Sequence, residues 1–311
     1  MRPTFPAAGL QRFGLRAMIA VMVAATALVG GRPAAAGQTS SDSRILIADQ
    51  FNNRVIEVGD NHQIVWSFGN GSRFAGPHSV VAPNDAERVG DLTLIAGTGA
   101  PAAPSATEPE CAANGCPDNR VMLVNPAGEI VWQYGSAGVS GSGPDQLNTP
   151  VFAAALPHGN VLIVDQSNER VIEVNRAKRI LWQYGTNNTP GDGPDQLNNP
   201  NSSELLANGD VLIADENNNR VIEVNRDKQI VWQYGRMSDT STLNGAAFAS
   251  RLPNGDTLIT DSGNSRVLEV NHDKQVVWSY VTNTAKGSIA APLPTRAVRL
   301  KIGRASCRER V

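Results

Sequence analysis

Short apolar runs, many of them rich in β-branched residues, recur along most of the chain and are separated by turns rich in Asn, Asp and Gly. The unit from Val211 to Gly235 contains the runs VLIAD, RVIEV and QIVWQYG in succession. On the last run Ile230, Trp232 and Tyr234 share one face, because side chains alternate along a strand. A further run, such as VFAAALP or AFASRLP, precedes the three. The pattern predicts four short strands per unit, joined by tight turns.

The unit occurs five times, and each copy carries an Arg followed twelve positions later by a Trp. The five pairs are Arg54 and Trp66, Arg120 and Trp132, Arg170 and Trp182, Arg220 and Trp232, and Arg266 and Trp278. Successive Trp residues are 66, 50, 50 and 46 positions apart, which is close to the length of a propeller blade. The sequence therefore predicts an all-β fold, a β-propeller of four-stranded antiparallel blades with five marked blades. The repeated aromatic and Arg residues are interpreted as blade packing.

Three phrases resemble known propeller repeats. GSGPDQLNTP followed by LPHGNVLIVDQSNERVIEV resembles the NHL repeat, and VIEVNRDKQIVWQYG is similar to the quinoprotein (PQQ-type) repeat, whose strand-ending Trp docks between blades. RLPNGDTLITD also resembles bacterial arylsulfotransferase-like propellers. The resemblance covers roughly residues 44–300 and implies an architecture more than an activity, because propellers carry many unrelated functions.

The two ends of the repeat region leave the number of blades open. The repeats begin with a second-strand motif, SRILIAD, while Pro294–Leu300 has the pattern of a first strand. This last segment either completes the first unit, giving five blades, or begins a sixth. We favour a truncated six-blade parent, because the resemblance to NHL propellers implies six blades.

Three segments differ in composition. Residues 1–36 combine Arg residues, an apolar stretch and small residues before Gly37, which predicts a signal peptide cleaved after Ala36. Residues 37–300 form the expected single propeller domain. Residues 301–311 match the in-frame translation of a sequencing adapter, and we expect this tail to be non-native. The protein is thus expected to be secreted or periplasmic.

Charge and cysteine content narrow the function classes further. Without the signal peptide and the tail, the chain has 19 basic and 28 acidic residues, a net charge of −9, which argues against nucleic-acid binding. No other apolar run is long enough to cross a membrane. Cys111 and Cys116 are an even pair in an exported chain and predict one disulfide, since Cys307 belongs to the tail.

The repeated carboxylates favour a structural role over a catalytic or metal-binding one. Four units place an Asp five residues before their Arg: Asp49, Asp165, Asp215 and Asp261. A pair that recurs in most blades is interpreted as turn hydrogen bonding with a local ion pair. Glycine-rich loops hold Asp145, Asp192 and Asp195, where calcium is conceivable, although the spacing lacks the dense oxygen ligands of a calcium loop. No cofactor and no metal site are predicted.

Blade two breaks the repeat, having Gly97 in place of the Asp and an insertion from Gly97 to Asn119. Loops on a rigid scaffold often carry binding residues, although a Pro- and Ala-rich insertion can equally be a tolerated surface loop. The candidate binding residues are Gly97, Glu108, Glu110, Asn114 and Asp118. Cys111 and Cys116 would close its tip.

Only one histidine is a catalytic candidate. His62, His158 and His272 occupy turn positions, whereas His78 is expected at the start of a first strand, near the central channel. The sequence favours an exported, monomeric propeller that binds a protein or small-molecule ligand at one face, and that is not an enzyme. The alternative is an arylsulfotransferase-like group transferase centred on His78. A quinoprotein dehydrogenase is disfavoured, because the two Cys are not adjacent.

Overall fold

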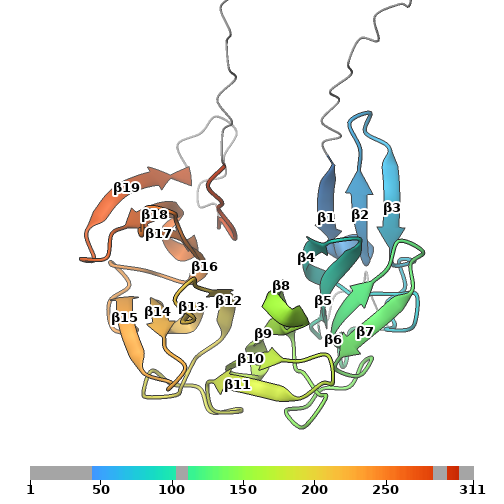
Figure 1. Cartoon of the computed structure of the whole chain (residues 1–311), viewed down its shortest axis with the longest axis horizontal. Helices are drawn as coiled ribbons and strands as arrows, with labels where there is room; N and C mark the ends of the chain where they lie inside the picture. The colour runs from blue at the N-terminus through green and yellow to red at the C-terminus, as the bar shows by residue number, and fades with distance from the viewer. Residues whose placement is uncertain (1–43, 103–110, 283–292, 301–311) are drawn as a thin grey trace, which may run out of the picture. The chain divides into compact units, whose positions relative to one another are not determined.

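The computed structural model describes residues 44–102, 111–282 and 293–300, all of which lie in one compact unit, Asp42–Val311 (Figure 1). The expected signal peptide, residues 1–36, and the expected non-native tail, residues 301–311, lie outside the described residues. Among the described residues, no helix has the length and apolar character needed to span a membrane.

Five antiparallel sheets, named here blades one to five, follow one another along the chain. Blade one comprises β1 (Ile45–Asp49), β2 (Arg54–Val58) and β3 (Ile64–Phe68). Blade two comprises β4 (Pro83–Val89), β5 (Leu92–Ala100), β6 (Cys116–Val124) and β7 (Ile130–Tyr134). Blade three comprises β8 (Pro150–Ala155), β9 (Val161–Asp165), β10 (Arg170–Val174) and β11 (Ile180–Tyr184). Blade four comprises β12 (Pro200–Leu205), β13 (Val211–Asp215), β14 (Arg220–Val224) and β15 (Ile230–Gly235). Blade five comprises β16 (Ala246–Arg251), β17 (Thr257–Asp261), β18 (Arg266–Val270) and β19 (Val276–Val281).

The sheets confirm the predicted all-β propeller of four-stranded antiparallel blades. Blades two to five have four strands each in sequential order, whereas blade one has three in the described residues. The first strands of successive blades contact one another: β4 contacts β8, and β12 contacts both β8 and β16. In blade one the described residues begin with the second-strand motif, which forms β1.

Buried strands in the middle of each blade explain the unbroken apolar runs. In blade three, β9 and β10 are buried along their whole length. Neighbouring blades cover both faces of these strands, so apolar residues occupy every position rather than alternate ones. The outer strand β11 alternates instead, with Leu181 exposed while Trp182 and Tyr184 are buried.

The core lies between blades. One apolar cluster joins Leu94 and Val121 of blade two to Ile163 and Ile172 of blade three. Similar clusters join blade three to blade four and blade four to blade five. Each blade therefore depends on its neighbour to bury its apolar face, as expected for a repeat architecture.

Polar contacts join neighbouring blades at two places, at the Trp of the outer strand and at the hairpin that precedes the repeat Arg. The indole N–H of Trp182 donates to the carbonyl of Arg226 in the next blade at 3.3 Å, and that of Trp232 donates to the carbonyl of His272 at 2.9 Å. At the opposite hairpins, the side-chain oxygen of Asn219 accepts the backbone N–H of Gly245 at 2.8 Å. The repeat Trp thus docks between blades, as the resemblance implied.

The segment Pro294–Leu300 packs on blade five as a first strand packs on the preceding blade. Arg299 pairs with Glu269 and lies 5.9 Å from the ring centre of Trp278. Arg251 of β16 makes the same two contacts, with Glu223 and Trp232 of blade four. Within the described ranges the segment joins no strand ladder, with β1 or otherwise. The six-blade parent therefore stays a prediction.

Candidate functional site

The first strands of blades three, four and five line a cavity of about 770 Å³, which we call the first-strand cavity. Its wall also includes the segment that follows blade five. Six side chains characterise it, namely Phe152, Ala154, Glu204, Leu205, Phe248 and Arg296. This volume falls within the range of cavities that hold small organic molecules.

Strand register places one residue of each first strand at the same level. Asp85, Phe152, Ser202 and Phe248 each follow a bulge at the start of their strand and each pair with the fourth residue of an equivalent second-strand run. Arg296 stands two residues after Pro294, as Phe152 stands two residues after Pro150. The fold therefore brings chemically different side chains to a common level around the first strands.

Polar side chains on these strands bind the backbone of the next first strand. Glu204 accepts the backbone N–H of Arg251 at 2.8 Å, and the hydroxyl of Ser202 accepts that of Ala249 at 3.1 Å. Glu87 accepts the N–H of Ala155 at 3.0 Å. Burial raises the pKa of Glu204, and the hydrogen bond from Arg251 opposes that rise. These carboxylates hold neighbouring strands together at the wall of the cavity.

Arg296 interacts with three side chains at the first-strand cavity. Its Nη1 donates to Oδ1 of Asp85 at 2.9 Å. Its guanidinium carbon lies 4.8 Å from the ring centre of Phe248 and 5.9 Å from that of Phe152. Burial raises the pKa of Asp85, and the charge of Arg296 opposes that rise. A cation thus lies against two aromatic rings and beside a buried carboxylate.

The blade-two candidates Gly97 and Asp118 turn out to be structural. Asp118 is fully buried, and its carboxylate accepts Nε of Arg120 at 2.6 Å and the backbone N–H of Val81 at 2.6 Å. A Cβ added at Gly97 would lie 2.7 Å from Cγ of Asp118. Asp118 therefore supplies the carboxylate that the Asp before the turn supplies in other blades, and only glycine leaves room for it. The signal in the sequence was an Asp two residues before the repeat Arg.

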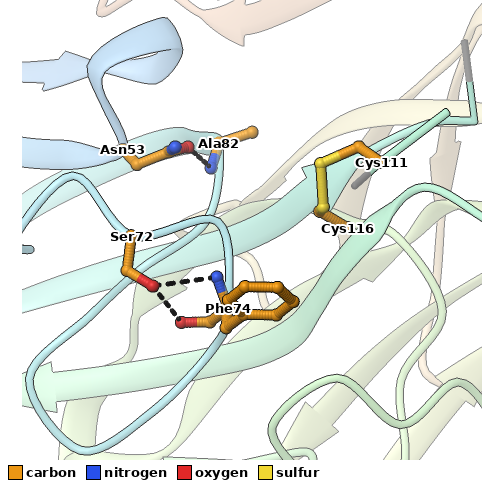
Figure 2. Close-up of a disulfide and its surroundings, with 6 residues drawn as sticks. All are labelled: Asn53, Ser72, Phe74, Ala82, Cys111 and Cys116. Atoms are coloured by element: carbon orange, nitrogen blue, oxygen red, sulfur yellow. Dashed lines mark hydrogen bonds between the residues drawn. A yellow bond between two sulfur atoms is a disulfide. The ribbon is translucent and has the colours of Figure 1, made fainter. Parts of the chain in front are cut away.

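The remaining blade-two residues are the other binding candidates and the two cysteines. Glu108 and Glu110 lie outside the described residues, and Asn114 is exposed in a turn. Cys111 and Cys116 form the predicted disulfide, with Cα atoms 5.0 Å apart (Figure 2). Both are buried against Val81 and Ala82, beside a small pocket of about 240 Å³.

We expect the disulfide to contribute modestly to stability. Replacing Cys111 and Cys116 with Ser should lower the free energy of unfolding by about 2 kcal/mol, because the closed loop is short and its closure entropy is small. Urea unfolding measures this loss. Thiol titration of the denatured, non-reduced full chain should detect Cys307 alone, so three free thiols would contradict the disulfide.

The repeated Asp and Arg pairs are turn interactions, as predicted. Asp165 accepts Nδ2 of Asn168 and Nε of Arg170, both at 2.7 Å, and the backbone N–H of Asn148 at 2.7 Å. Equivalent ion pairs join Asp49 to Arg54, Asp215 to Arg220 and Asp261 to Arg266. The carboxylate oxygens of Asp165 thus serve the hairpin itself.

The acidic loop residues considered for calcium also have structural partners. Asp145 accepts the backbone N–H of Gly135 at 2.9 Å and the ammonium of Lys178 at 2.7 Å. Asp195 makes the equivalent contacts with Gly185 and Lys228. The carbonyl of Asp192 accepts Nη1 of Arg220 at 2.9 Å. In the part of the chain that the structure describes, no group of three or more His, Cys, Asp or Glu side chains could hold a metal ion.

The structure corrects the expected position of His78. It is exposed in a turn closed by the bridge between Gly76 and Ser79, and β4 begins only at Pro83. Its pocket is formed with Pro77 and residues 129–133 around the outer strand β7, away from the first strands. The chain uses the intervening buried residues Val80–Ala82 to reach the blade, so His78 does not face the first-strand cavity.

Comparison with known proteins agrees with this architecture. No curated protein matches the sequence. Among solved structures, a protein of unknown function from Bacteroides caccae is 14% identical with a TM-score of 0.54, covering 79% of this chain and 76% of that chain. Virginiamycin B lyase from Staphylococcus aureus is 12% identical with a TM-score of 0.52, covering 78% of this chain and 67% of that chain. At these identities the similarity concerns the fold.

A family model describes the repeat region directly. Residues 117–299 match the PQQ-type repeat model described as outer membrane protein assembly factor BamB. The match includes blades three, four and five, the strands that line the first-strand cavity, and Arg296. Since it spans more than half of the sequence, the chain belongs to this PQQ-type repeat family of β-propellers.

Proposed function

We propose that the protein is an exported binding scaffold whose ligand occupies the first-strand cavity. The observation that carries the proposal is the cavity itself, about 770 Å³ and lined by the first strands of three blades. Its wall is mainly apolar, with Glu204 and Arg296 as charged groups, a composition typical of sites for organic ligands. The description of the matching family model, an assembly factor, supports a scaffold role over a catalytic one.

The group-transfer alternative gains no support from the surroundings of His78. A nucleophilic His needs charged neighbours that stabilise the leaving group. The described residues that line its pocket are Pro77, Glu129, Ile130, Val131, Trp132 and Gln133, none of them cationic. We therefore retain the binding function and expect no turnover of aryl sulfate donors.

A neutral apolar fluorophore tests the proposal. N-phenylnaphthylamine should bind the full chain with increased fluorescence, because the apolar cavity wall excludes water around it. Ala154 lines the cavity, and Ala154→Trp should weaken this binding by about tenfold, equivalent to about 1.4 kcal/mol, since the larger side chain fills the site.

Ala137 provides the matched control, because it is an exposed alanine in a turn away from the cavity. Ala137→Trp should bind the fluorophore as the wild type does. Circular dichroism and thermal unfolding establish that both variants are folded. Equal affinity in the wild type, Ala154→Trp and Ala137→Trp would contradict a ligand site in the first-strand cavity.

A further inference from the structure

Asp85, Phe152 and Phe248 all interact with one guanidinium group at the first-strand cavity. They come from β4, β8 and β16, three different blades, and the guanidinium belongs to Arg296 in the segment after blade five. The rings of Phe152 and Phe248 contact each other edge to face, with centres 6.2 Å apart. We call Asp85, Phe152 and Phe248 the guanidinium cradle.

The cradle has the chemistry that recognises a planar cation. Asp85 is only 8% exposed, and the charge of Arg296 and the backbone N–H groups of Ala153 and Ala86 lower its pKa against the effect of burial. A carboxylate held in this way forms a strong charge-assisted hydrogen bond with a guanidinium. Aromatic faces add a cation–π attraction, which is strongest for desolvated cations. A guanidinium also stacks on rings and is more weakly hydrated than an ammonium group, so it suits the site better.

Arg296, which occupies the cradle, is more exposed than Asp85 and lies outside the strand ladders that hold the cradle residues. The side chain of Arg296 is 49% exposed, whereas that of Asp85 is 10% exposed. In the described part of the chain, residues 293–300 join no strand ladder, while Asp85, Phe152 and Phe248 all lie within four-stranded sheets. The cradle can therefore persist while Arg296 leaves it, because its three side chains do not depend on the segment for their strand pairing.

We propose that the cradle binds the guanidinium group of a ligand in the first-strand cavity and that Arg296 is an internal occupant which the ligand displaces. The inference rests on the proposed function in that the ligand's apolar part lies in the same cavity. Phe152, Phe248 and Arg296 all line that cavity, so a guanidinium at the cradle is continuous with its apolar wall. An internal competitor lowers the apparent affinity to the intrinsic affinity multiplied by the fraction of time that the site is open.

Removing the competitor tests this directly. Butylguanidinium is the probe, since it carries the cation on a short apolar tail. Isothermal titration should show that Arg296→Ala binds it at least about tenfold more tightly than the wild type. Adding Asp85→Asn to Arg296→Ala should abolish the gain, because the carboxylate that anchors the cation is lost. The isosteric neutral compound butylurea should not bind either protein measurably.

Arg299→Ala is the matched control, because Arg299 lies three residues from Arg296 but contacts Glu269 and Trp278 instead of the cradle. It should bind butylguanidinium as weakly as the wild type. Since Arg296→Ala leaves Asp85 without its cation, its melting temperature should fall and should recover with butylguanidinium but not with butylurea. The proposal would be overturned if Arg296→Ala bound butylguanidinium no more tightly than Arg299→Ala does. It would also be overturned if butylurea bound as tightly as butylguanidinium.

The two probes distinguish failure of the cradle proposal from failure of the proposed function. If butylguanidinium fails to bind while N-phenylnaphthylamine binding still depends on Ala154, the cavity is a ligand site but the cradle is only an internal latch. If both probes fail, the proposed function itself is wrong.

Discussion

Trp232→Ala is expected to lower the free energy of unfolding by about 3–5 kcal/mol, the usual loss when a large buried aromatic side chain is removed. Trp232 is 4% exposed and belongs to the apolar cluster between blades four and five. Its indole N–H also donates to the carbonyl of His272 in blade five. The substitution therefore removes an interblade contact, creates a cavity and leaves the carbonyl of His272 without its indole donor.

Trp278 is the control that the chain itself provides, since it holds the same repeat position but is 45% exposed. Trp278→Ala should cost about 1 kcal/mol or less, because little apolar area leaves solvent there. Trp182, which is buried, should behave like Trp232. Urea unfolding with an unchanged m-value measures the three losses. Similar losses at Trp232 and Trp278 would show that the repeat position, and not burial between blades, determines the effect.

Repetition made the fold predictable from the sequence. The Arg and Trp positions, the turn Asp and the strand runs recur in unit after unit. Each strand and turn predicted in one unit is therefore supported by the same pattern in the others. Burial was less predictable, because it depends on the next blade. Trp232 and Trp278 have the same local sequence context but differ widely in exposure.

The candidate site was not predictable because it lies where the repeat varies. Asp85, Phe152 and Phe248 occupy equivalent positions, but one is a carboxylate, two are aromatic, and blade four has Ser202 there, so no motif marks them. Arg296 is separated from Asp85 by 211 positions in the sequence. The order of the blades and the packing of the segment after blade five bring the two together. The sequence pointed instead to the blade-two insertion as a binding loop and to His78 as the one catalytic candidate, because both stand out from the repeat.

Arg170→Met is expected to cost about 3–5 kcal/mol at neutral pH, because it leaves a buried charge without its partner. Arg170 and Asp165 have side chains that are 1% and 0% exposed, and their N–O distance is 2.7 Å. Arg170 also donates to the carbonyls of Ser142 and Gln146. Methionine fills much of the space of the Arg stem but donates no hydrogen bonds, so Asp165 and both carbonyls lose a partner.

The same pair in blade one supplies the control. Arg54 and Asp49 are also 2.7 Å apart, but their side chains are 39% and 22% exposed. Solvent screens an exposed pair, so Arg54→Met should cost at most about 1 kcal/mol. Unfolding in urea at neutral pH compares the two variants. Equal losses would mean that the repeat ion pair acts in the same way whatever its burial, which would contradict the argument from desolvation.

The cost of Arg170→Met should also depend on pH, with a definite sign. Burial raises the pKa of Asp165 in the native state, and losing the charge of Arg170, which lowers it, raises it further. A raised native pKa means that the folded chain holds the proton more tightly than the unfolded chain, so stability is lost as pH rises through that pKa. The difference in the free energy of unfolding between wild type and variant should therefore be smallest below the native pKa of wild-type Asp165. It should widen as pH rises toward the higher pKa of the variant and become constant above it. Urea unfolding of both proteins at several pH values between about 4 and 8 measures the gap. A gap that does not change with pH would show that the lost carbonyl hydrogen bonds, and not the unpaired carboxylate, account for the destabilisation.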